Sequence, residues 1–147
     1  MRTALLILFC HASLFAQSGT MSGTWKLDTS SSDFGRFELA RHLTLTIEPS
    51  ADGFQFFYDY RGPSQYLVRT ITVDGNDHST GIATETAAAA RLDVGLLVRY
   101  QQSGANSPVY FELWKLSNDG LTLTRVRQLR GGAQQDESKL VFRRISD

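Results

Sequence analysis

Apolar and polar residues alternate in short segments along most of the chain, as they do in half-buried β-strands. In residues 41–48, Leu43, Leu45 and Ile47 lie on one face and polar residues lie on the other. Residues 54–60 are mostly aromatic, which favours a sheet. The pattern predicts strands at residues 23–28, 41–48, 54–60, 66–73, 95–102, 109–117, 121–129 and 139–144.

Turn-forming residues separate these segments at regular intervals. Residues 49–53 and 61–64 are rich in Gly, Pro, Ser and Asp, and Asp74-Gly75 is a dipeptide typical of tight hairpins. No long helical period occurs. The sequence therefore predicts an all-β, antiparallel up-and-down meander of about eight to ten strands, closed into a barrel or folded as a sandwich.

Residues 84–92 (TETAAAARL) carry conflicting signals. Their helix propensity is the best in the protein, yet they have no apolar stripe beyond alanine and lie between Gly81 and Gly95 in a chain of strands. Because small side chains suit a crowded barrel wall, we predict a strand at residues 84–93 in preference to a helix. Residues 30–37 are predicted to form a loop or a single helical turn.

The N-terminus has the features of a secretory signal peptide. Arg2 precedes an almost continuously apolar run at residues 4–15, and Ala16 supplies the small residue at which signal peptidase cuts. We therefore expect a signal peptide at residues 1–16, a mature chain that begins at Gln17, and a secreted or periplasmic protein.

The only cysteine, Cys10, lies within this signal. Phe9 precedes it where lipoprotein processing requires a small residue, so we expect no lipid anchor. Residues 17–147 are then expected to form one domain without a disulfide, and we expect a monomer held together by its core. The 15 basic and 15 acidic residues form no basic block, which argues against nucleic-acid binding, and no segment of the mature domain is apolar over a membrane-spanning length.

Residues suited to catalysis or metal binding are few. The mature chain has only His42, on the polar face of its segment, and His78, beside Asp77 in a turn. Two adjacent ligands make a poor metal site, and no nucleophile or metal motif occurs. We therefore predict a protein that is not an enzyme, with no metal and no cofactor.

Six short segments stand out in order along the mature chain: residues 23–27 (GTWKL), 32–34 (SDF), 73–75 (VDG), 90–93 (ARLD), 112–123 (ELWKLSNDGLTL) and 141–144 (VFRR). Together they resemble a family of small secreted bacterial proteins with a lipocalin-like barrel. The resemblance covers nearly all of the mature chain.

This resemblance implies an up-and-down β-barrel of the calycin type. In such barrels the Trp of a Gly-x-Trp on the first strand packs across the floor, and a basic residue on the last strand stacks on its indole. Trp25 matches the floor residue, and Arg143 or Arg144 matches its partner. Where relatives have Trp-Asp-Gly, this chain has Leu-Asp-Val-Gly at residues 92–95, so we expect the wall there to pack differently.

Alternation along the strands assigns several polar side chains to the apolar, inner face of the barrel. An inward Arg is costly without a partner, so it is expected to meet an acidic side chain or the carboxylate of a ligand. The candidate ligand-binding residues are Tyr58, Tyr60, Arg69, Tyr100, Arg125 and Arg127. An alternative interpretation of residues 125–127 is a solvated strand end near the rim.

Two functions stay open at this point. The first is a secreted or periplasmic binding protein that holds a small hydrophobic or amphipathic acid in its barrel. The second is a filled barrel without a ligand that acts through its outer surface as an interaction or structural module. An exposed Phe57, opposite Phe56 on its strand, would favour the second.

We predict that the exported protein begins at or within a few residues of Gln17 and contains no thiol, because the apolar run ends at Ala16. Intact-mass analysis of the protein from its host measures this. A mass that retains residues 1–16, or that includes lipid on Cys10, contradicts it.

Overall fold

Ten β-strands build the computed structural model, which describes residues 20–35, 42–61, 66–93, 95–104, 106–130 and 136–147. The described residues contain no helix. The strands are β1 (Gly23–Leu27), β2 (Thr44–Ser50), β3 (Gly53–Asp59), β4 (Tyr66–Thr72), β5 (His78–Ser79), β6 (Glu85–Leu92), β7 (Gly95–Gln102), β8 (Val109–Leu116), β9 (Thr122–Arg130) and β10 (Glu137–Ser146).

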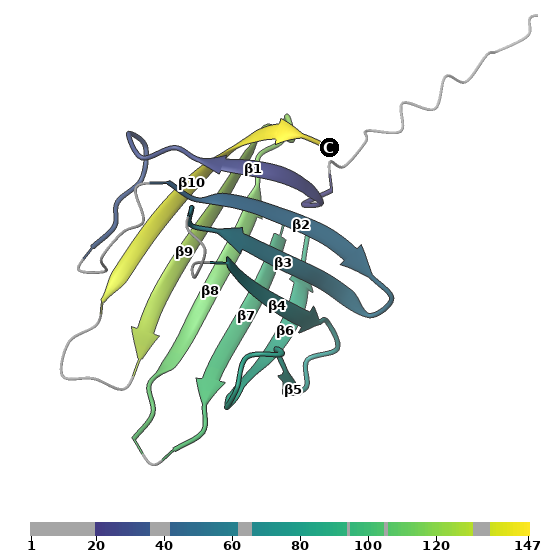
Figure 1. The fold of residues 1–147 in the computed structure, drawn as a ribbon, viewed down its shortest axis with the longest axis vertical. Helices are drawn as coiled ribbons and strands as arrows, with labels where there is room; N and C mark the ends of the chain where they lie inside the picture. Colours follow the sequence, from purple (N-terminus) through teal and green to yellow (C-terminus); the bar gives the residue numbers. More distant parts are fainter. Residues whose placement is uncertain (1–19, 36–41, 62–65, 94, 105, 131–135) are drawn as a thin grey trace, which may run out of the picture.

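The strands form one antiparallel sheet in the order β4-β3-β2-β1-β10-β9-β8-β7-β6-β5. In Figure 1, β2, β3 and β4 cross in front of β7, β8 and β9, so that the two halves of the sheet face each other. The edges nearly meet, because the Thr70 amide donates a hydrogen bond of 2.9 Å to the Thr80 carbonyl just after β5. The predicted all-β meander is therefore confirmed, and it is a nearly closed barrel.

Antiparallel pairing gives the barrel two distinct ends. Turns after β2, β6 and β8 form one end, which we call the floor, and connections after β3, β7 and β9 form the other, which we call the mouth. Odd-numbered strands run from floor to mouth, and even-numbered strands run back. A residue's position along its strand therefore tells how close to the mouth it lies.

Trp25 seals the floor end. Its side chain is fully buried, and its indole Nε1 donates a hydrogen bond to the Met21 carbonyl at 3.0 Å. The guanidinium carbon of Arg144 lies 4.2 Å from the centre of the Trp25 ring. The same guanidinium donates hydrogen bonds of 2.7 Å to the carbonyls of Gly120, Ser22 and Thr20. Of the two residues expected to stack on Trp25, Arg143 and Arg144, it is Arg144 that does so.

The alanine-rich segment is a strand, as predicted. Ala87 and Ala89 of β6 point inward and are each 2% exposed. Opposite them in register lie Tyr100 and Val98 of β7. Packing next to these larger side chains decides the conformation, and it overrides the helix propensity of the segment.

Two predicted turns are wrong. Residues 49 and 50 belong to β2, and β3 begins at Gly53, where an added Cβ would lie 1.9 Å from the Ile71 carbonyl oxygen. Glycine therefore lets the strand start here, and the turn has only two residues. Asp74-Gly75 makes no tight hairpin, because the Gly75 amide donates to the Ala89 carbonyl at 2.9 Å and holds this longer connection against β6.

The bounds of other strands differ from the predicted bounds by a few residues. The strand predicted at residues 41–48 begins at Thr44, and the last strand is longer than predicted, with Glu137 and Ser146 as its ends. Residues 30–35 form a loop in which the Asp28 carboxylate accepts hydrogen bonds from the Ser30 amide and hydroxyl. Residues 36 and 37 of the predicted loop, and residue 41, lie outside the described residues.

We predict that Trp25→Ala lowers the free energy of unfolding by about 3 to 5 kcal/mol, a large share of the roughly 5 to 15 kcal/mol of a typical domain. The loss follows from the cavity left under Arg144. Chemical denaturation measures it, with Leu121→Ala as control, because Leu121 is 57% exposed in the turn before β9. Equal midpoints for the two variants would show that Trp25 does not seal the floor.

Candidate functional site

The inner face of the barrel changes from apolar near the floor to polar toward the mouth. Fully buried inward side chains of the floor half include Phe56, Leu96, Trp114, Leu123 and Phe142. The inward side chains next along the strands toward the mouth form what we call the polar cluster: Tyr58, Tyr60, Arg69, Glu85, Tyr100, Glu112, Arg125 and Arg127. Strand alternation alone brings these groups together, because every second side chain faces the lumen.

Glu112 lies at the centre of the polar cluster and is fully buried. Its Oε1 accepts a hydrogen bond of 2.9 Å from Arg127 Nε and lies 3.5 Å from Arg125 Nη1. Its Oε2 accepts a hydrogen bond of 3.1 Å from the indole Nε1 of Trp114. Burial by itself raises the pKa of Glu112, but Arg127, Arg125 and Arg69 outweigh burial and lower the pKa to about 2. The side chain is therefore ionised at neutral pH.

Arg125 has fewer partners than its charge requires. It is 6% exposed, and its Nε has no hydrogen-bond partner among the described residues. Its guanidinium carbon lies 5.7 Å from the centre of the Trp114 ring. Burial lowers the pKa of Arg125, and the nearby Glu112 offsets this only in part. The site thus holds a buried cation that can accept a further anionic partner.

A second ion pair joins the two edges of the sheet. Arg69 on β4 donates from Nε and Nη2 to the two carboxylate oxygens of Glu85 on β6, at 2.8 and 3.0 Å. Thr80 Oγ1 donates to the same carboxylate at 2.8 Å. The Arg69 guanidinium carbon also lies 5.5 Å from the Tyr58 ring centre and 5.1 Å from that of Tyr100. Arg69 is therefore fully engaged within the protein.

Two buried tyrosines carry hydroxyls without a hydrogen-bond partner in the described part of the chain. Tyr58 is fully buried and Tyr100 is 3% exposed. Burial raises the pKa of both hydroxyls, and the charge of Glu112 raises it further. Both therefore stay protonated and can donate. Tyr60, just after the end of β3, stacks on Tyr58 with ring centres 6.2 Å apart.

All six residues predicted to bind a ligand lie on the inner face, in the polar cluster: Tyr58, Tyr60, Arg69, Tyr100, Arg125 and Arg127. The alternative of a solvated strand end is wrong for Arg125, which is 6% exposed, and Arg127 is held by Glu112. That these residues bind a ligand stays a prediction.

An acidic side chain was one of the two partners expected for an inward Arg, but the sequence analysis did not identify Glu112 or Glu85 as that partner. Glu112 stands two residues before Trp114, so the two side chains lie on the same, inner face of β8. This position could have identified Glu112 as the partner, because an inward Arg requires a counter-charge. Glu85 gave no such signal, because its segment combined helix propensity with a strand context. Its contact with Arg69 also depends on how the barrel closes.

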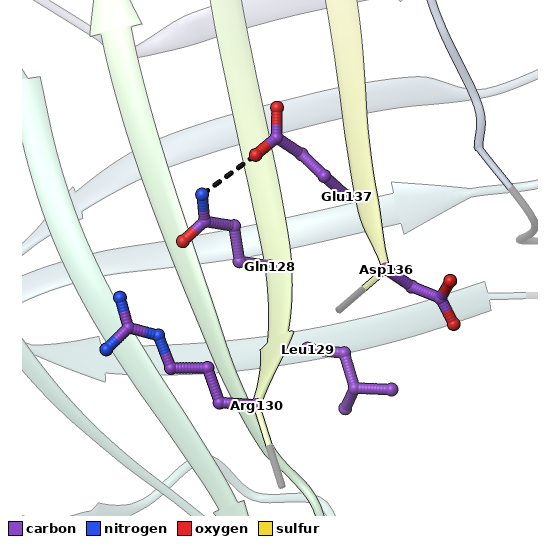
Figure 2. A pocket seen from close by; sticks show the side chains of 5 residues that line it. All are labelled: Gln128, Leu129, Arg130, Asp136 and Glu137. Atoms are coloured by element: carbon purple, nitrogen blue, oxygen red, sulfur yellow. Dashed lines mark hydrogen bonds between the residues drawn. The ribbon is translucent and has the colours of Figure 1, made fainter. Parts of the chain in front are cut away.

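A cleft of about 270 Å³ lies at the mouth end of β9 and β10, lined by Gln128, Leu129, Arg130, Asp136 and Glu137 (Figure 2). Gln128 donates a hydrogen bond of 2.8 Å to Glu137 across its wall. None of the five lining residues is buried. Because the buried groups that lack partners lie in the lumen instead, we place the candidate site in the polar cluster.

The histidine turn does not assemble a catalytic pair. His78 Nε2 lies 2.8 Å from the carboxylate of Asp74, whereas Asp77 is bound by Arg99 at 2.8 Å. Within the ranges that the structure describes, no group of three His, Cys, Asp or Glu side chains is arranged to hold a metal ion. Within the same ranges, no helix has the length and hydropathy to cross a membrane.

Comparison with known proteins adds information on the fold. No protein-family model matches the chain, and no curated protein matches its sequence. Among solved structures, lipid binding protein 8 of Caenorhabditis elegans, in its apo form, matches with a TM-score of 0.57 and 16% identity, over 86% of this chain and 98% of that one. The REP1-NXSQ fatty acid transporter matches with a TM-score of 0.55 and 11% identity, over 84% of this chain and 95% of that one. The chain therefore shares its β-barrel fold with these two proteins.

We predict that Glu112→Gln lowers stability at neutral pH and flattens the dependence of stability on pH. The pKa of Glu112 is lowered from 4.5 to about 2, so its ionisation stabilises the protein above pH 4.5 and this contribution is lost as the pH falls toward 2. Urea denaturation at a series of pH values measures the effect. Glu48→Gln, at an exposed position of β2, is the control. A pH dependence equal to that of the unmodified protein would contradict the prediction.

Proposed function

We propose that the protein binds a small amphipathic acid in the mouth half of its lumen, with the acid's carboxylate on Arg125. The observation that carries the proposal is an imbalance of charge in the polar cluster. Within the described part of the chain, three guanidinium groups of the polar cluster face two carboxylates, which leaves one positive charge in excess: Arg69, Arg125 and Arg127 against Glu85 and Glu112. A buried charge without a full counter-charge is costly, so an anionic ligand is the natural complement.

The unpartnered polar atoms supply the hydrogen bonds that a carboxylate needs. Arg125 Nε, the Tyr58 hydroxyl and the Tyr100 hydroxyl are all donors, and all three are buried without a partner among the described residues. A carboxylate has acceptor sites for several donors, and charge-assisted hydrogen bonds to it are strong. One carboxylate would therefore satisfy these donors and neutralise the excess charge together.

The apolar surroundings support an amphipathic ligand rather than a small inorganic anion. Partly buried Leu67, Tyr60 and Tyr110 pack against the core around these donors. Leu67 is opposite Tyr58 in register and Tyr110 is opposite Tyr100, whereas Tyr60 follows Tyr58 toward the mouth. Two proteins of similar fold are named as a fatty acid transporter and a lipid binding protein, which also supports a hydrophobic ligand. The signal peptide expected at residues 1–16 supports a carrier that works in the periplasm or outside the cell.

A filled barrel that acts through its surface is the second candidate. Contact between Phe56 and Trp114 inside the lumen favours it, and Tyr66 is 61% exposed on the outer face beside the half-buried Phe57. However, a barrel filled only by its own side chains has no reason to bury three polar atoms without partners. We therefore prefer the binding function.

We predict that a dansyl-labelled medium-chain fatty acid binds the protein saturably, and that Arg125→Gln weakens binding by about tenfold or more. Loss of a charge-assisted hydrogen bond costs about 1.5 to 3 kcal/mol, which corresponds to that factor. Fluorescence titration measures the dissociation constants, and circular dichroism verifies the fold of each variant. The double variant with Arg127→Gln is expected to bind no better than Arg125→Gln alone.

The control for charge is Arg99→Gln, which removes an exposed arginine of β7 whose partner is Asp77. We expect this variant to bind like the unmodified protein. Tyr58→Phe and Tyr100→Phe keep the charge and are each expected to weaken binding several-fold. Equal affinity for the Arg125 and Arg99 variants contradicts carboxylate capture, and no saturable binding to the unmodified protein favours the filled barrel.

A further inference from the structure

Aromatic side chains from opposite walls meet in the middle of the lumen. Phe56 lies on β3 and Trp114 on β8, and four strands separate β3 from β8 in either direction around the barrel. Their ring centres are nonetheless only 5.2 Å apart, in an edge-to-face arrangement, and both side chains are fully buried. A contact between facing walls blocks the lumen at this level.

Further rings extend this contact across the barrel. Trp114 stacks on Phe142 of β10 with ring centres 6.2 Å apart, and Phe56 lies 6.3 Å from Phe54. We call Phe54, Phe56, Trp114 and Phe142 the aromatic plug. At the packing density of protein interiors, such interlocked rings leave no passage for an alkyl chain toward the floor.

The groups that would hold a carboxylate lie beside the plug and on its mouth side. Arg125 is opposite Trp114 in register, and Tyr58 and Tyr100 lie nearer the mouth. Tyr58 follows Phe56 toward the mouth on β3, with ring centres 6.3 Å apart. Glu112 is the next inward residue toward the mouth from Trp114 on β8, and Arg125 lies with its guanidinium carbon 5.7 Å from the Trp114 ring. An acid bound here therefore has its head group at the closed end of the available space.

Only a short length of the barrel wall lies on the mouth side of Arg125. From Arg125 to Leu129, the inward residue of β9 closest to the mouth, the strand advances four residues, which corresponds to roughly 13 Å. This is the length of a medium-chain fatty acid or of a compact aromatic acid. A longer chain would extend past the mouth into water.

We propose that the aromatic plug sets the length of the ligand. The protein then selects compact amphipathic monocarboxylic acids, bound with the carboxylate against the plug and the apolar part toward the mouth. This inference rests on the proposed binding function and adds the orientation and size of the acid, with Phe56 and Trp114 as the residues that determine them.

A series of unbranched fatty acids tests the length limit in the unmodified protein. Calorimetric competition against the dansyl-labelled probe gives the affinity of hexanoate, octanoate, decanoate, dodecanoate and palmitate. We expect roughly a four-fold gain in affinity for each methylene that is buried, and no gain once the chain reaches the mouth. Affinity that continues to rise through palmitate overturns the length limit.

Bromine quenching of tryptophan fluorescence tests the orientation without any variant. Trp114 belongs to the plug, whereas Trp25 lies at the floor and provides an unquenched background. An acid brominated beside its carboxylate should quench Trp114, and one brominated at the far end should not. The opposite order of quenching overturns the proposed orientation.

Variants of the plug separate its role from that of the carboxylate site. Phe56→Ala, or the milder Phe56→Leu if the first does not fold, opens the plug, so that an acid held at Arg125 can also extend its chain toward the floor. The affinity of palmitate relative to octanoate should then increase at least several-fold. Phe57→Ala is the matched control, since Phe57 is the next residue of β3 and contacts Tyr66 on the outer face. An unchanged ratio in the Phe56 variants overturns the plug as the determinant of length.

The two proposals fail in different ways. If acids bind and Arg125→Gln weakens them, but length and bromine position have no effect, the plug proposal falls and the binding function stands. If no acid in the series competes with the probe or binds alone, the binding function falls, and the plug proposal falls with it.

Discussion

The buried carboxylate of Glu112 is the interaction on which the polar half of the interior depends. It binds Arg127 directly, lies 3.5 Å from Arg125 and accepts the indole proton of Trp114. Without it, two guanidinium groups would face each other in a medium that stabilises neither charge. A single carboxylate cannot neutralise both, and Glu85 is already engaged by Arg69. The unmatched charge among the described residues follows from this arrangement, and the proposed binding of an acid rests on it.

The residues that close the floor and the residues of the proposed binding site lie at different levels along the barrel axis. The floor is closed by Trp25 and Arg144. Each of the three guanidinium nitrogens of Arg144 donates to a backbone carbonyl, and one of them also donates to Asp147. The aromatic plug then fills the middle of the lumen, and the charged groups come only after it. Because these groups sit on paired strands rather than on loops, their geometry is fixed before a ligand arrives.

Much of this arrangement could be predicted from alternation along single strands. The inward positions of Tyr58, Tyr100 and Arg125 follow from their neighbours two residues away, and the alanine-rich strand follows from its context. Features that depend on contacts between distant strands could not be predicted. Whether Phe56 reaches Trp114 across the lumen, or Glu85 reaches the opposite edge of the sheet, depends on barrel closure, which no local pattern encodes.

The most direct test of the account compares a medium-chain fatty acid with its methyl ester in the unmodified protein. The two ligands share their apolar part, and only the acid has the charge that the excess guanidinium requires. Isothermal titration calorimetry should show saturable binding of decanoate and binding of methyl decanoate that is weaker by about tenfold or more. Equal affinity for the two would contradict the claim that the unmatched buried charge is what binds the ligand.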